Sequence, residues 1–68
     1  MEKDWKCVFQ TDQIYQAEIA REILGNAEIK CVVINEHDSI FPSHGDVEVW
    51  VHQDFELKAV ELLKELIN

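Results

Sequence analysis

The segment Asp46–His52, DVEVWVH, alternates between valine and polar or aromatic side chains. Its valines share one parity, and Glu48, Trp50 and His52 share the other. Because successive side chains of a β-strand point to opposite faces of a sheet, this pattern predicts a strand with one face buried under other elements. The chain must therefore build a sheet with two chemically different faces.

Two further segments predict strands. Trp5–Gln10 is rich in β-branched and aromatic residues and contains no glycine or proline. Lys30–Asn35 is a short run with consecutive apolar, β-branched residues, which predicts a strand that is buried on at least one side. The parity of these two strands, unlike that of Asp46–His52, stays open.

The residues between the first two strands predict an amphipathic helix. Thr11 and Asp12 are good N-cap residues, so we expect the helix to start directly after them. Helix stop signals place its end between Leu24 and Ala27. The expected apolar face consists of Ile19, Ala20, Ile23 and Leu24, with Ala17 on its flank.

A second amphipathic helix is expected in the last part of the sequence, FELKAVELLKELI. Asp54 directly precedes it and is the expected N-cap. The apolar stripe of this helix consists of Phe55, Ala59, Leu62, Leu63, Leu66 and Ile67.

The order strand, helix, strand, strand, helix predicts one α+β domain over residues 1–68. The first crossover should be right-handed, and both helices should bury their stripes on the same face of the sheet. This is a truncated ferredoxin-like βαββα arrangement, a three-stranded sheet in spatial order first, third, second, with two helices on one face.

This arrangement predicts an exposed edge and an exposed face. The outer edge of Trp5–Gln10, where a complete ferredoxin-like fold has its fourth strand, should present unpaired backbone groups. The face opposite the valines should carry Trp50 without a helix to cover it. The candidate interface residues are Trp5, Phe9, Glu48, Trp50 and His52, and Cys7 and Phe9 join the exposed face only if the first strand has the matching parity.

The segment EHDSIFPSHG, residues 36–45, has neither helical nor strand periodicity. Its candidate ligand-binding residues are His37, Phe41 and His44, and imidazole groups suit transition metals. The histidines lack the spacing of a usual metal site, so a connector at the rim of the sheet is the preferred interpretation. The alternative is a loop that closes over a small molecule or a metal.

Charge and cysteine content narrow the classes of partner. The formal net charge is −8, a field that repels phosphate backbones and anionic lipids, so neither nucleic acid nor a membrane is expected as a partner. The chain has no basic leader and no run of ~20 apolar residues, which predicts a cytoplasmic protein. Cys7 and Cys31 are then expected as free thiols, on strands too far apart for a disulfide.

The segments QAEIAREIL, EIKCVVIN and HGDVEVWVHQDFELKAVELLKEL together resemble a small bacterial family described as putative signal-transducing proteins, grouped with the GlnB-like ferredoxin-like folds. The resemblance extends from Trp5 to Ile67. The family usually has Ala-Gly-Ile between helix and strand, whereas this chain reads Ala27-Glu28-Ile29. A glutamate there must either take a positive φ at a cost of about 1 kcal/mol or end the helix differently.

The resemblance implies a small regulatory or binding module, and the residues themselves contain no nucleophile elbow and no catalytic arrangement. We therefore expect a non-enzymatic module without a cofactor. It should act by forming a homodimer or by docking to a protein partner, and a small ligand held by residues 36–45 is the alternative.

Overall fold

The alternating segment forms β3 (Val47–His52), the central strand of an antiparallel sheet ordered β1-β3-β2. The computed structural model describes residues 3–35 and 47–67 of the 68. The other elements are β1 (Trp5–Thr11), α1 (Ile14–Asn26), β2 (Cys31–Asn35), the 3-10 turn η1 (Gln53–Phe55), α2 (Glu56–Leu62) and α3 (Lys64–Ile67). The predicted α+β class and strand order are confirmed.

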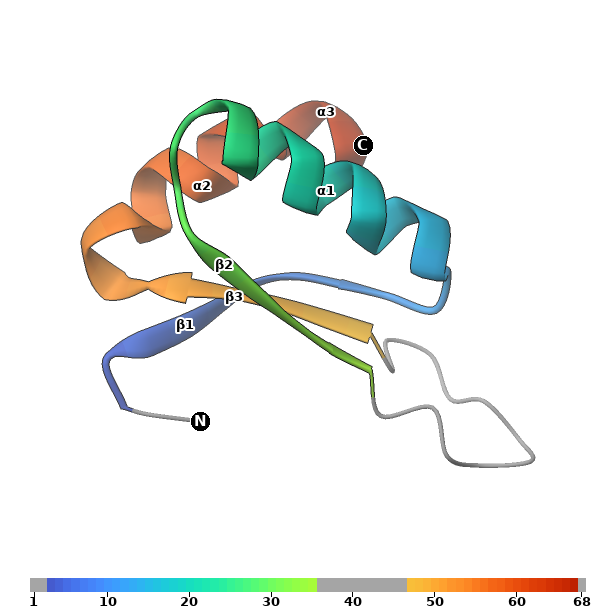
Figure 1. Ribbon diagram of the computed structural model, residues 1–68, viewed down its shortest axis with the longest axis horizontal. Coiled ribbons are helices and arrows are strands. Elements are labelled where there is room, and N and C mark those ends of the chain that lie inside the picture. The colour runs from blue at the N-terminus through green and yellow to red at the C-terminus, as the bar shows by residue number, and fades with distance from the viewer. Residues whose placement is uncertain (1–2, 36–46, 68) are drawn as a thin grey trace.

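All three helices lie on one side of the sheet, as Figure 1 shows. α1 contacts all three strands, and α2 contacts β1 and β3. This arrangement confirms the truncated ferredoxin-like fold. No helix within the described ranges has the length and apolar character to cross a membrane.

The core lies between the helices and the odd-numbered residues of β3. Val49 and Val51 are completely buried, and Val47 nearly so. Because alanine is small, the buried alanines of α1 and α2 allow these helices to pack closely on the valines. The largest fully buried side chains are Leu24 of α1 and Leu63, which lies between α2 and α3.

The buried face of α1 differs from the predicted stripe. Ala17, Ala20 and Leu24 are the buried residues of this helix, whereas Ile19 is 41% exposed. The expected inclusion of Ile19 is therefore wrong. The helix is rotated so that Ala17, Ala20 and Leu24 face the sheet, and the two alanines allow it to pack closely there.

The start of α1 also differs from the prediction. Thr11 ends β1 and Gln13 occupies the N-cap position without a side-chain cap. The Thr11 hydroxyl accepts a hydrogen bond from the Gln13 amide at 3.0 Å and donates one to Gln16 Oε1 at 2.7 Å. Thr11 thus supports the turn before the helix instead of capping the helix itself.

The end of α1 resolves the question raised by Glu28, which has a positive φ of 62°. The Ile29 amide donates to the Leu24 carbonyl at 2.9 Å, and the Glu28 amide donates to the Gly25 carbonyl at 3.0 Å. These two bonds define a Schellman motif, in which glycine usually takes the left-handed position. Glu28 takes it here, and the contact between buried Leu24 and Ile29 stabilises the turn.

The predicted second helix is divided into η1, α2 and α3. Asp54 lies inside η1, and its amide donates to His52 Nδ1 at 3.1 Å, so His52 and not Asp54 is the cap. Ala59 and Leu63 are buried as expected, but Phe55 is 42% exposed and lies outside the stripe.

Candidate functional site

The side of the sheet opposite the helices carries a second set of side chains, which we call the open face. It is assigned from β3, whose even-numbered residues point away from the buried valines, and from the residues that pair with them on the neighbouring strands. The open face consists of Trp5, Cys7 and Gln10 of β1, Val32 and Ile34 of β2, and Glu48, Trp50 and His52 of β3.

An irregularity in β1 decides which of its residues belong to the open face. Cys7 pairs with Trp50 and Phe9 pairs with Val49, so the register shifts between Cys7 and Phe9. As a result both Val8 and Phe9 are buried under the helices. Phe9 is therefore a core residue, which corrects its prediction as an interface residue; Cys7 takes the place on the open face.

The two tryptophans occupy one end and the centre of the open face. Trp5 pairs across the sheet with His52, and their rings meet edge to face with centroids 6.1 Å apart. Trp50 lies between Cys7 on β1 and Val32 on β2. The centre of the open face is therefore an apolar row that runs across all three strands.

Glu48 connects this apolar row to the polar end of the open face. One of its carboxylate oxygens accepts a hydrogen bond from the Trp50 indole N–H at 3.1 Å. The other accepts a hydrogen bond from the side-chain amide of Gln10 at 3.0 Å. The indole nitrogen is thereby satisfied, and its hydrogen bond fixes the direction of the ring along the sheet. Trp50 is partly buried and still presents ring surface on the open face.

His52 is held at the other end by its hydrogen bond from the Asp54 amide. Because Nδ1 accepts this bond, Nε2 carries the proton of the neutral ring. The Asp54 carboxylate lies 3.5 Å from Nδ1, longer than a normal hydrogen bond, so the amide contact sets the orientation of the ring.

The cysteines lie on opposite faces of the sheet. Cys7 is on the open face, and Cys31 pairs with Val51 and packs against the core. Burial raises the pKa of both thiols; for Cys7 the nearby charge of Glu48 raises the pKa further, and for Cys31 the charge of Arg21 opposes the shift. β3 separates the two strands, both cysteines are free, and a raised pKa disfavours the reactive thiolate.

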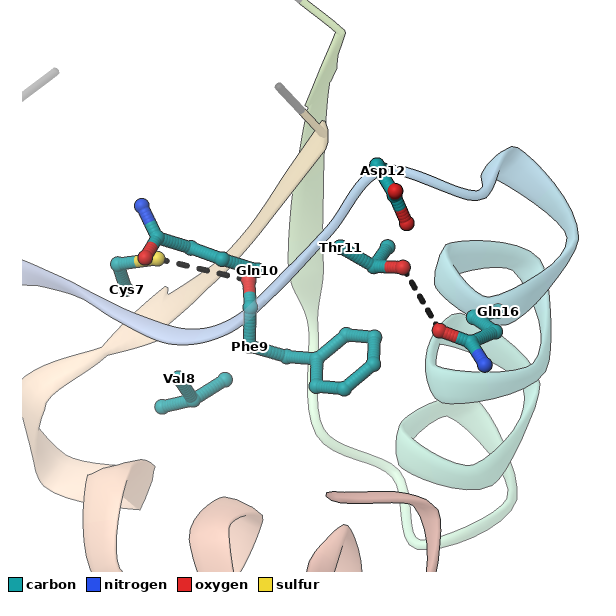
Figure 2. A pocket seen from close by; sticks show the side chains of 7 residues that line it. All are labelled: Cys7, Val8, Phe9, Gln10, Thr11, Asp12 and Gln16. Atoms are coloured by element: carbon teal, nitrogen blue, oxygen red, sulfur yellow. Dashed lines mark hydrogen bonds between the residues drawn. The ribbon is translucent and has the colours of Figure 1, made fainter. Parts of the chain in front are cut away.

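A groove of about 530 Å³ lies beside the later half of β1. Its lining residues are Cys7, Val8, Phe9, Gln10, Thr11, Asp12 and Gln16. Figure 2 shows the groove with Val8 and Phe9 directed toward the helices, Cys7 and Gln10 on the other side of the strand, and Asp12 beside Thr11 and Gln16. β1 is at the edge of the sheet, so the predicted exposed edge and this groove coincide.

The candidate ligand residues His37, Phe41 and His44 lie outside the described residues. Within residues 3–35 and 47–67 no group of three or more histidine, cysteine, aspartate or glutamate side chains is arranged to hold a metal ion.

Three open-face residues were not predicted there from the sequence: Gln10, Val32 and Ile34. A signal for the two β2 residues is present in CVVIN, because consecutive apolar residues in a strand must put apolar side chains on both faces. Gln10 could not be assigned, since the register shift in β1 reverses the parity of every residue after it.

A family model, DUF2007, described as "Putative prokaryotic signal transducing protein", matches residues 5–67. Neither the comparison with curated proteins nor the comparison with solved structures gives a match.

Proposed function

We propose that this chain, which belongs to the DUF2007 family of putative prokaryotic signal transducing proteins, is a non-enzymatic binding module that pairs with a second copy through the open face of its sheet. The observation that carries the proposal is the apolar row Cys7, Trp50 and Val32, which no described element covers. Aromatic residues with a satisfied polar atom are typical of interface centres.

A second copy suits the open face because the chemistry of β3 is self-complementary. Glu48 and His52 flank Trp50 at equal distances along the strand. In a dimer whose twofold axis passes near Trp50, the two indoles meet at the centre and Glu48 of each copy faces His52 of the other. Such an isologous contact uses the same patch twice and closes without further copies.

The distribution of charge also favours a second copy of this chain as the partner of the open face. The chain carries a formal charge of −8, yet among residues 3–35 and 47–67 Glu48 is the one carboxylate of the open face. Charges elsewhere on the two copies are screened beyond about 8 Å at physiological ionic strength. Apolar contact can therefore exceed the repulsion between copies, and added salt should strengthen the dimer.

In this proposal the module acts in a reducing cytoplasm, where its thiols stay free, and it transmits a signal by changing between monomer and dimer. The structure of the open face fits such a role because a small contact area gives an association that responds to concentration.

Sedimentation equilibrium over a range of protein concentrations tests the proposal. The unmodified chain should form dimers at high micromolar concentration. Trp50→Glu should weaken the dimer by about 30-fold, the effect of losing a central aromatic residue worth ~2 kcal/mol. Leu57→Glu is the matched control, because Leu57 is 86% exposed on α2 and lies on the helix side of the sheet.

A chain that stays monomeric throughout this concentration range would reject the proposal. Equal dissociation by Trp50→Glu and Leu57→Glu would reject the open face as the interface. Circular dichroism of both variants establishes that each is folded.

A further inference from the structure

The groove beside β1 shares Cys7 and Gln10 with the open face and has two chemically different sides. Its helix side is apolar and is formed by Val8 and Phe9, both less than a tenth exposed. Its other side carries Cys7 and Gln10, and the Asp12 carboxylate lies at the far end near Thr11 and Gln16, as Figure 2 shows. No lining residue is basic, so the groove is apolar toward the helices and carries a carboxylate at the end beside α1.

The groove also has a backbone edge. β1 pairs with β3 on one side, and no described strand pairs with it on the other. Alternate residues of an edge strand direct amide and carbonyl groups outward, where an added strand can bind them. An added strand has side chains on alternating faces, and the two sides of the groove match that alternation.

The two halves of β1 differ in how well they can accept such a strand. Lys6 pairs with Val51 and therefore points to the helix side, a position at which a charged residue deters strand pairing. The register shift between Cys7 and Phe9 interrupts the ladder just after it. The usable edge is thus the segment from Phe9 to Thr11, which lies within the groove.

Thr11 and Gln16 close the far end of the groove. The Thr11 hydroxyl donates to Gln16 Oε1 and also accepts the Gln13 amide, so the strand end and the first turn of α1 are held together. The groove therefore has a fixed wall at this end and does not depend on a mobile side chain.

We propose that this groove binds a short extended segment of another protein by β-strand addition to Phe9–Thr11. The segment carries apolar residues toward Val8 and Phe9 and a lysine or arginine toward Asp12. Main-chain hydrogen bonds provide the affinity in this type of recognition, and the alternating side chains provide the selectivity.

Charge and geometry favour a basic segment over a second copy of this chain. The groove is acidic within a protein of net charge −8, so a basic segment is attracted at long range. Two copies paired along β1 would bring together two register shifts and two exposed Lys6 charges, which disfavours a continuous ladder.

The test uses the full chain carrying Trp50→Glu, so that pairing through the open face does not interfere. The probe is a fluorescent peptide of alternating valine and lysine, about eight residues long, which extends over roughly 26 Å. Fluorescence anisotropy should show binding that weakens as salt is raised, whereas a valine and glutamate peptide of the same length should not bind.

Two peptides with N-methyl groups separate strand addition from charge attraction. One carries them on the odd residues and the other on the even residues, so each lacks the amide donors along one edge. Binding of one peptide and loss of binding by the other is the expected result. Equal affinity of both would overturn strand addition, because charge attraction alone does not distinguish the two edges.

Charge-changing variants locate the contact. Asp12→Lys should weaken binding of the valine and lysine peptide by about tenfold, because it reverses a close opposite charge. Asp12→Asn, which only removes that charge, should weaken binding by less. Glu22→Lys makes the same change in net charge at an exposed position of α1 that does not line the groove. Equal effects of Asp12→Lys and Glu22→Lys would place binding elsewhere and overturn the assignment.

A dimer that persists in the Trp50→Glu protein and dissociates with Asp12→Lys would show that a second copy occupies the groove, which would also overturn the proposal. Failure of peptide binding leaves the open-face dimer unaffected, because that contact is measured separately by its molecular mass.

Discussion

The two faces of β3 share one backbone and differ in what covers them. Val49 and Val51 are completely buried under the helices, whereas their neighbour Trp50 is only partly buried on the open face. Trp50 has far more apolar surface than valine, so burial here follows the position of the helices and not the size of the side chain. The partial exposure of so large an apolar side chain is the reason for proposing a contact surface on this face.

The two faces also contribute differently to folding and to binding. Burial of a valine contributes about 1.5–3 kcal/mol to folding. Trp50 keeps part of its ring surface for association, and Glu48 holds the ring in place through its hydrogen bond. The covered face thus determines whether the chain folds, and the open face is available to determine what the folded chain binds.

The largest expected effect is a difference in folding stability between two variants, Val49→Glu and Trp50→Glu, which place a glutamate on opposite faces of β3. Val49→Glu buries an unpaired carboxylate at a cost of several kcal/mol, which is comparable with the entire stability of about 3–10 kcal/mol for a chain of this length. We expect that protein to be unfolded by circular dichroism at 25 °C. Trp50→Glu should keep the native spectrum, and comparable loss of structure in both variants would refute the division between the faces.

The two cysteines give a smaller but more local comparison, since one lies on each face. Alkylation with iodoacetamide should be slow at neutral pH, because burial raises the pKa of both thiols and the thiolate is the reactive form. In the variants Cys31→Ala and Cys7→Ala, which retain one thiol each, rates are measured at alkaline pH. Cys7 should react several-fold more slowly as the protein dimerises, and Cys31 should not respond to protein concentration.

A concentration-dependent rate for Cys31, or a constant rate for Cys7 in a sample that sedimentation shows to be dimeric, would contradict the open face as the interface. This measurement differs from Trp50→Glu in that it leaves the aromatic centre unchanged.

Glu28→Gly should have the smallest effect and should act on folding alone. Glycine adopts the left-handed conformation of this Schellman position without strain, so stability should rise by about 0.5–1 kcal/mol. Glu22→Gly, within α1, should instead lower stability by about 1 kcal/mol. Urea unfolding measures both, and the dimer constant of Glu28→Gly should equal that of the unmodified chain.

A decrease in stability with Glu28→Gly would mean that the glutamate side chain contributes more than its backbone strain costs. A changed dimer constant would couple the end of α1 to the open face, which its position on the helix side does not predict.

The predictions from sequence succeeded where covalent geometry alone sets the outcome. The alternation of β3, the order of the elements and the placement of the helices on one face follow from periodicities of two and 3.6 residues and from the handedness of crossovers. The same reasoning placed Glu48, Trp50 and His52 together, and the pairing of β3 puts them on the open face.

Other assignments depended on contacts between distant parts of the chain. Phe9 was a candidate for the open face only with one parity of β1, and it lies in the core because pairing with β3 introduces a register shift that the residues of β1 do not indicate. Ile19 was expected in the buried stripe and is exposed, because the distance between helix and sheet selects alanine at the contact. The role of the open-face residues stays a prediction.

The sequence by itself determined the set of elements and the parity of β3, since these depend on neighbours within a few residues. The tertiary structure decided which residues of β1 share a face, which side of α1 is buried and where the edge groove lies. Register and helix rotation are set by packing between segments far apart in the chain, and a local pattern contains no measure of that packing.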